Sequence, residues 1–91
     1  MANKLRIEIW EGESMEWSLE GDGSELQYDH ASIKLRALFP EQEDIRLVLN
    51  KDEVREVERI RAIEEVKGLE GRDNLMLTDN DYTKMMIFIY S

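Results

Sequence analysis

The segment from Lys51 to Lys67 constrains the fold most, because it is flanked by residues typical of both ends of a helix. Asn50 is a residue type that caps the first helical turn, and Glu53, three positions later, can complete a capping box. At the other end, Gly68 can adopt the left-handed conformation that closes many helices. The sequence therefore predicts one principal helix over residues 51–67, ending at a left-handed Gly68.

The apolar residues of this predicted helix recur at every third position. They are Val54, Val57, Ile60, Ile63 and Val66. At about 100° per residue, each step of three turns the stripe back by roughly 60°, so the stripe winds around the helix. Two arrangements could cover such a stripe. We expect a strongly twisted sheet that curls round the helix; the alternative is one layer of the fold together with a second protein chain.

Two half-buried strands are predicted near the N-terminus, where apolar and polar residues alternate. Their apolar sets are Leu5, Ile7 and Ile9, and then Met15, Trp17 and Leu19. The apolar faces match only if Ile9 lies opposite Met15, which fixes the register of the hairpin. This register places Glu8 opposite Glu16 on the outer face, with Trp10 on the same face. Such a like-charge pair lowers stability.

Residues 24–39 support two interpretations. In the first, a Ser24–Gln27 capping box starts a helix whose apolar stripe is Tyr28, Ala31, Leu35 and Leu38. In the second, a strand has the apolar face Ile33, Leu35, Ala37 and Phe39. Folding about a turn at residues 40–44 sets Phe39 opposite Ile45 and makes every following pair apolar. We therefore predict a hairpin, with a strand over residues 32–39.

The C-terminal part predicts a third hairpin. Strands are expected at residues 74–78 and 82–90, on either side of turn-forming residues 79–81. The unbroken apolar run at 85–90 is typical of a strand buried on both faces, with Met86 and Phe88 on one face. The expected architecture is a single α+β domain over residues 1–91, in the order β-hairpin, β-hairpin, helix, β-hairpin. Its mostly antiparallel sheet of about six strands packs around one principal helix.

Composition excludes several classes of function. The chain of 91 residues contains no cysteine, which excludes disulfides, thiolate metal sites and thiol nucleophiles. No stretch resembles a signal peptide or a membrane span, so a cytoplasmic protein is expected. The net charge of −9 argues against direct binding of nucleic acid or anionic membrane. Eight acidic residues and no basic ones lie between Ile7 and Ile33, so nearly all of the net charge resides there.

Candidate catalytic and metal-binding residues are few. His30 is the single histidine. Its neighbours Asp29 and Ser32 do not make it a triad, because triad groups converge from separate elements, and we expect His30 in a surface loop. Residues 79–81 begin like a calcium loop, but Lys84 occupies the position of the required glycine. We therefore expect a protein that is not an enzyme, with no metal site and no cofactor.

Trp10 is the strongest candidate for a binding residue, because tryptophan often anchors protein interfaces. The alternative is that it packs under a loop or against residues 25–29. The predicted partner-binding face comprises Trp10, Glu8, Glu11, Glu13, Glu16 and Glu20. A cationic partner surface would relieve the predicted repulsion between Glu8 and Glu16.

The leading functional hypothesis is a non-enzymatic binding protein. Its acidic N-terminal hairpin would dock on a basic surface of another protein, including one that normally holds nucleic acid. In composition the chain resembles the small acidic inhibitors of phages, which block restriction or CRISPR machinery by imitating DNA. One alternative is a homo-oligomeric structural subunit, such as a homodimer, that uses the surface of helix 51–67. A second alternative, ranked last, is a small hydrolase or cation-binding domain.

Overall fold

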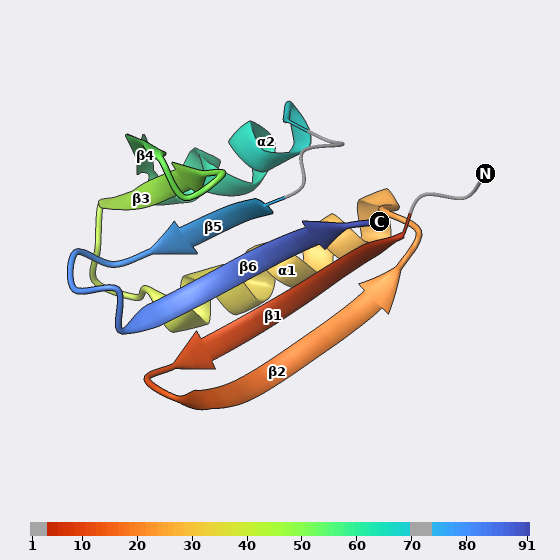
Figure 1. The fold of residues 1–91 in the computed structure, drawn as a ribbon, viewed down its shortest axis with the longest axis horizontal. Coiled ribbons are helices and arrows are strands. Elements are labelled where there is room, and N and C mark those ends of the chain that lie inside the picture. Colours follow the sequence, from red (N-terminus) through yellow and green to blue (C-terminus); the bar gives the residue numbers. More distant parts are fainter. Residues whose placement is uncertain (1–3, 70–73) are drawn as a thin grey trace.

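The computed structural model describes residues 4–69 and 74–91, which form an α+β fold with one antiparallel sheet (Figure 1). The six strands are β1 (Leu5–Glu11), β2 (Ser14–Gly21), β3 (Asp44–Leu49), β4 (Glu53–Glu58), β5 (Asn74–Thr78) and β6 (Lys84–Tyr90). The helices are α1 (Glu25–Leu38) and α2 (Ala62–Lys67), with a 3-10 turn η1 (Arg59–Arg61) before α2. The strand order is β2-β1-β6-β5-β3-β4, so β2 and β4 are the two edges. The predicted fold class is confirmed.

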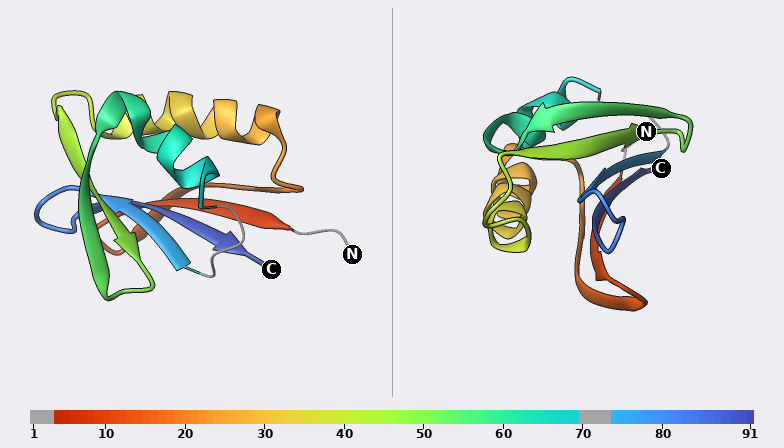
Figure 2. Two further views of the ribbon diagram at one scale, coloured as in Figure 1. Left: turned by 90° about the horizontal axis from the view of Figure 1, so that it is seen from above. Right: turned by 90° about the vertical axis from the view of Figure 1, so that its left-hand side faces the viewer.

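Both helices lie on the same face of a strongly twisted sheet (Figure 2). The core between the helices and the sheet is largely apolar, and its largest buried side chains include Phe39, Phe88, Leu35, Leu47 and Met86. Among residues 4–69 and 74–91, no helix or strand covers the opposite face of the sheet, although Val48 and Thr78 on that face are buried. No helix in those ranges is long and apolar enough to cross a membrane.

Helix α1 replaces the strand predicted over residues 32–39, and that prediction is wrong. Ser24 caps the helix, with its hydroxyl oxygen 3.4 Å from the amide nitrogen of Gln27. The Gln27 side chain accepts a hydrogen bond from the amide of Gly23 at 2.8 Å and donates one to the carbonyl of Leu5 at 2.8 Å. Ser24 therefore starts the helix, and Gln27, which bonds the amide of Gly23 where a capping box would bond that of Ser24, also fastens it to β1. The residues buried along α1 are Gln27 and the four residues of the predicted helical stripe, Tyr28, Ala31, Leu35 and Leu38.

The predicted helix over residues 51–67 is wrong in its first half, where residues 53–58 form strand β4, and only its last residues, Ala62–Lys67, are α-helical. Asn50 and Lys51 have positive φ angles of 53° and 69°, and the amide of Asp52 donates to the carbonyl of Leu49 at 3.1 Å. Two successive left-handed residues make the type of turn that joins adjacent antiparallel strands. Asparagine favours both helix caps and left-handed turns, so Asn50 did not distinguish the two structures.

The winding apolar stripe has a different origin from the one that we expected. Val54 and Val57 lie on opposite faces of β4, as residues three apart in a strand must. Val57 and Val48 are buried, whereas Val54 is 47% exposed. Further along, Ile63 and Val66 are buried on the short helix α2. The stripe belongs to two elements, and no sheet curls around a helix at 51–67.

Gly68 ends α2 without a left-handed conformation. Its φ is −65° and its ψ is −14°, both in the right-handed helical region. Its amide donates to the carbonyl of Glu64 at 3.1 Å, which continues the helical pattern. The predicted left-handed ending is therefore wrong.

The hairpin of β1 and β2 forms as predicted but in another register. Ile9 lies opposite Trp17 instead of Met15, and Glu8 lies opposite Ser18 instead of Glu16. The register differs from the prediction by two residues: the turn contains only Gly12 and Glu13, and Glu16 is an extra, bulged residue in β2. The predicted pair of Glu8 and Glu16 is therefore wrong, and the repulsion assigned to it is absent.

The C-terminal hairpin is confirmed. Strand β5 spans the residues predicted for it, and β6 lies in the interior of the sheet between β1 and β5. Met86 and Phe88 are fully buried on the helix side of the sheet, as predicted. Met85, Ile87 and Ile89 alternate with them on the other face and are only half-buried, so β6 is covered on one face alone.

Candidate protein-binding surface

A row of three apolar side chains crosses the uncovered face of the sheet near the β1–β2 turn. Trp10 on β1 pairs with Met15 on β2 and with Met85 on β6. Paired residues in an antiparallel sheet project from the same face, so the three side chains lie side by side. Trp10 and Met85 are half-buried, and Met15 is 44% exposed. We call these three residues the Trp10 row.

Glu8 orients the indole ring of Trp10. The indole N–H donates to one carboxylate oxygen of Glu8 at 3.0 Å, and Arg6 Nε donates to the other at 2.6 Å. The hydrogen bond from Trp10 lowers the pKa of the Glu8 carboxyl, burial opposes this effect, and Arg6 reinforces it. The side chain of Glu8 is only 14% exposed. Glu8 therefore holds Trp10 in place and offers little surface of its own.

The other predicted acids border the Trp10 row. Glu11, Glu13 and Glu16 are exposed at the end of the hairpin, and among the residues that the structure describes none of them has a basic group within 4.0 Å. Glu20 lies at the far end of β2, 3.8 Å from Arg6. The structure thus brings Glu11, Glu13 and Glu16 together around the turn, and separates Glu8 and Glu20 from them.

Backbone contacts hold the acidic turn against the rest of the sheet. Gly12, at φ 63°, donates from its amide to the carbonyl of Thr83 at 2.8 Å. Thr83 is fixed in turn by Asp79, whose carboxylate accepts from the Thr83 amide at 2.9 Å. Residues 79–81 therefore form a turn as predicted, and this turn supports the hairpin beside it.

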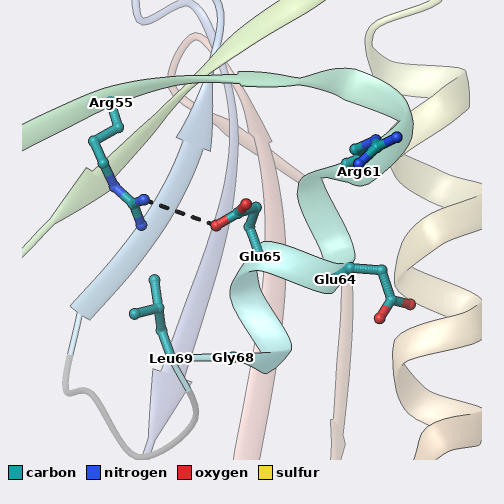
Figure 3. A pocket seen from close by; sticks show the side chains of 6 residues that line it. All are labelled: Arg55, Arg61, Glu64, Glu65, Gly68 and Leu69. Carbon is teal, nitrogen blue, oxygen red and sulfur yellow. Dashed lines mark ion pairs between the residues drawn. The ribbon is translucent and has the colours of Figure 1, made fainter.

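A shallow hollow of about 550 Å³ lies between β4 and α2 (Figure 3). Arg55 and Glu65 point toward one another across it, 3.8 Å apart. Arg61 also borders the hollow and pairs with Glu58 at 3.3 Å. Each arginine in this hollow therefore has a carboxylate partner, and neither is left to bind an external anion.

His30 lies exposed on α1 and not in a loop as we expected. It borders a smaller hollow of about 170 Å³, between the end of β2 and the start of α1. In the described ranges 4–69 and 74–91, no three histidine, cysteine, aspartate or glutamate side chains are grouped so that they could hold a metal ion.

Sequence reasoning identified Trp10 and its acidic neighbours but missed the two methionines beside it. Met15 was assigned to the buried face, because strict alternation was assumed along β2. The bulge at Glu16 moves Met15 to the face of Trp10. No residue in this stretch marks the bulge, so only the pairing in the sheet could reveal it.

Comparisons with models of protein families, with curated proteins and with solved structures found no match to this chain.

Proposed function

We propose that this protein is a non-enzymatic binding protein whose β1–β2 hairpin docks on a basic surface of another protein. The observation that carries the proposal is the Trp10 row on an uncovered sheet face, bordered by the exposed acids Glu11, Glu13 and Glu16. An apolar centre with a polar rim is the usual anatomy of a protein interface. Acids without basic partners on their own chain would gain most from a cationic partner.

Repulsion between Glu8 and Glu16 plays no part in this site, because the two residues are not paired. Glu8 is satisfied by Arg6 and Trp10, so we assign it to holding the indole ring. The rim of the site is then Glu11, Glu13 and Glu16, and Glu20 lies apart from it at the far end of β2. Nucleic-acid-binding proteins are the first partner class to test, since their basic surfaces match an acidic rim.

A homo-oligomer that uses the surface of helix 51–67 is not favoured. That surface is divided between an edge strand and a short helix. Three of the four charged residues of β4 are already joined in ion pairs: Glu56 with Arg46 of β3, Arg55 with Glu65, and Glu58 with Arg61.

A competition experiment tests the proposal. A fluorescent DNA duplex is bound to purified restriction and RNA-guided nucleases, and its release is measured as the protein is added at low and high salt. We expect the protein to release DNA, and to do so less effectively at high salt. When Glu11, Glu13 and Glu16 are all changed to Gln, the protein concentration needed for half-release should rise by about tenfold or more. Trp10→Ala should have a comparable effect through faster dissociation.

The control variant is Glu53→Gln combined with Glu58→Gln on the opposite edge, which should release DNA as the wild type does. Equal potency of the rim variant and the wild type would contradict the proposed site. Failure to release DNA from any nuclease would remove this partner class.

A further inference from the structure

The free edge of β2 borders a small hollow between the end of β2 and the start of α1, lined by Leu19, Leu26 and His30 among others. Strand β2 pairs with β1 on one side and, among residues 4–69 and 74–91, with no strand on the other (Figure 1). The bulge disturbs β2 only beside the turn, so residues 17–21 keep a regular register with β1. This regular part of the edge can accept hydrogen bonds and donate them to another extended chain.

The wall formed by α1 is apolar and exposed. Leu26 and Ile33 are 65% and 66% exposed, and His30 lies between them at helical spacing. Leu26 and His30 line the hollow of about 170 Å³ together with Leu19 of β2. This volume lies below the range of about 300–1,000 Å³ that is usual for small-molecule sites, so the hollow suits a single side chain.

The two faces of the β2 edge differ in chemistry. Trp17 and Leu19 project toward α1 and are half-buried, with Lys34 of α1 placed 5.5 Å from the centre of the Trp17 ring. Ser18 and Glu20 project from the opposite, uncovered face. A strand added to this edge would alternate in the same way, with one set of side chains beside Trp17 and Leu19 and the other beside Glu20.

We propose that the edge of β2 binds an extended peptide segment of its partner, as an additional strand, in which Lys or Arg alternates with aliphatic residues. The aliphatic side chains contact Leu19, Leu26 and Ile33, and the basic side chains lie beside Glu20 and the exposed Glu16. Lys34 disfavours a segment that is basic on both faces. This inference rests on the proposed function, because it names the partner chemistry for the same hairpin.

A second copy of this chain is a poorer occupant of the same edge. Pairing two β2 strands edge to edge would bring the Glu16 and Glu20 side chains of both copies together. Like charges directly opposite one another destabilise strand pairs, and charged side chains are a common means of keeping strand edges apart. Each copy also carries a net charge of −9.

The probe is a synthetic peptide of about eight residues in which Lys alternates with Val, a length typical of strands. One control has the same composition with the Lys and Val residues in separate blocks. Another is N-methylated at alternate residues, which removes backbone hydrogen bonds along one edge. Binding is measured by calorimetry, and amide hydrogen exchange reports which protein amides become protected.

We expect the alternating peptide to bind one to one and to protect amides in residues 17–21. Binding should weaken by about tenfold or more when the peptide is N-methylated, and also in two protein variants, Leu26→Ser with Ile33→Ser and Glu16→Lys with Glu20→Lys. The control variant Ile60→Ser, which changes an exposed isoleucine elsewhere, should bind the peptide as the wild type does. The Lys variants should bind a Glu-Val peptide instead. Equal binding of the N-methylated or block peptide, protection elsewhere, or no binding would overturn the inference.

Two further measurements separate this inference from the proposed function. Light scattering of the free protein should show a monomer. If it shows a dimer, and if the variant that combines Glu16→Lys, Glu20→Lys and Leu26→Ser is a monomer, the β2 edge pairs with a second copy and the inference is overturned. Trp10→Ala should weaken DNA release by about tenfold or more in the competition experiment but retain peptide binding. If peptide binding persists while the wild type releases no DNA, the strand site stands and the proposed partner class fails.

Discussion

The two edge hairpins of the sheet use charge in opposite ways. On β4, three of the four charged side chains have partners: Glu56 lies 3.3 Å from Arg46, Arg55 lies 3.8 Å from Glu65, and Glu58 lies 3.3 Å from Arg61. On the β1–β2 hairpin, Glu13 and Glu16 are exposed and have no basic partner within 4.0 Å in the described part of the chain. Both edges are charged enough to discourage aggregation, but the β1–β2 hairpin gathers acids without a basic partner around its turn.

The hairpins also differ in how they are fastened to the fold. The β1–β2 hairpin is tied to α1 by Gln27 and to the β5–β6 turn through the amide of Gly12. The β3–β4 hairpin has a turn of two left-handed residues with side chains, Asn50 and Lys51. A binding hairpin needs a fixed geometry, whereas a solvated edge tolerates backbone strain at its turn.

The largest effect is expected from Gln27→Ala, which breaks the fastening of the first hairpin. The change leaves the Leu5 carbonyl and the Gly23 amide without their side-chain partner, at a cost of about 2–3 kcal/mol. Urea unfolding measures the loss. The neighbouring exposed Leu26→Ala serves as the control and should change stability by no more than about 0.5 kcal/mol. Similar values for both variants would show that Gln27 does not fasten α1 to β1.

Both turns should be more stable with glycine at their left-handed positions, so removing one glycine and adding another should have effects of opposite sign. Gly12→Ala places a side chain at φ 63° with no atom within 4 Å of the new Cβ, so its cost of about 1 kcal/mol comes from the backbone alone. Lys51→Gly relieves a side chain at φ 69° and should stabilise by up to about 1 kcal/mol. Thermal unfolding measures both changes. A destabilised Lys51→Gly protein would contradict the left-handed turn and revive the helical interpretation of residues 51–67.

Charge reversal compares the two edges directly. Glu56→Lys replaces the partner of Arg46 by a like charge and should destabilise by about 0.5 kcal/mol at low salt. Glu16→Lys removes one negative charge from the cluster of acidic residues at the β1–β2 turn, so it should leave the free energy of unfolding unchanged or raise it by a few tenths of a kcal/mol. Unfolding at two ionic strengths measures both, since added salt should reduce each effect. A clear loss of stability in Glu16→Lys would mean that the carboxylate already has a partner.

The smallest effect concerns the pKa of Glu8. In the folded protein this pKa lies below its ordinary value of 4.5, so Glu8 stabilises the fold above that pH, and the contribution is lost as pH falls through the folded-state pKa. Trp10→Phe removes the indole N–H, so the pKa should rise and less stability should be lost on acidification. Carboxyl NMR titration measures the pKa. Trp17→Phe is the control, and an unchanged pKa in Trp10→Phe would show that the indole is not the dominant cause.

Sequence patterns were reliable where a single periodicity covered a whole element. Alternation predicted the strands β1 and β2, whereas the turn residues 79–81 and the unbroken apolar run at 85–90 predicted β5 and an interior β6. The same alternation brought Trp10 to the outer face with its acidic neighbours. These assignments depend on local residue order alone, because side chains in a strand must alternate between faces.

Signals shared by two structures misled the prediction. Asn50 suits a helix cap and a left-handed turn equally, and Phe39 fits both an apolar strand pair and the end of α1, where it is fully buried. Local energies of about 1 kcal/mol separate such alternatives, which is less than the burial of one large apolar side chain contributes. The tertiary core therefore decided that residues 25–38 are helical and that residues 53–58 are a strand.

The sequence by itself determined the class of the fold, the four strands of the N- and C-terminal hairpins, and the concentration of acid in the first hairpin. Only the tertiary structure decided the register of that hairpin, the Trp10 row and the small hollow between β2 and α1. A two-residue turn and a one-residue bulge together placed Met15 on the face of Trp10 and separated Glu8 from Glu16. Register depends on long-range strand pairing and on which faces are buried, and a one-residue shift reverses every side chain beyond it.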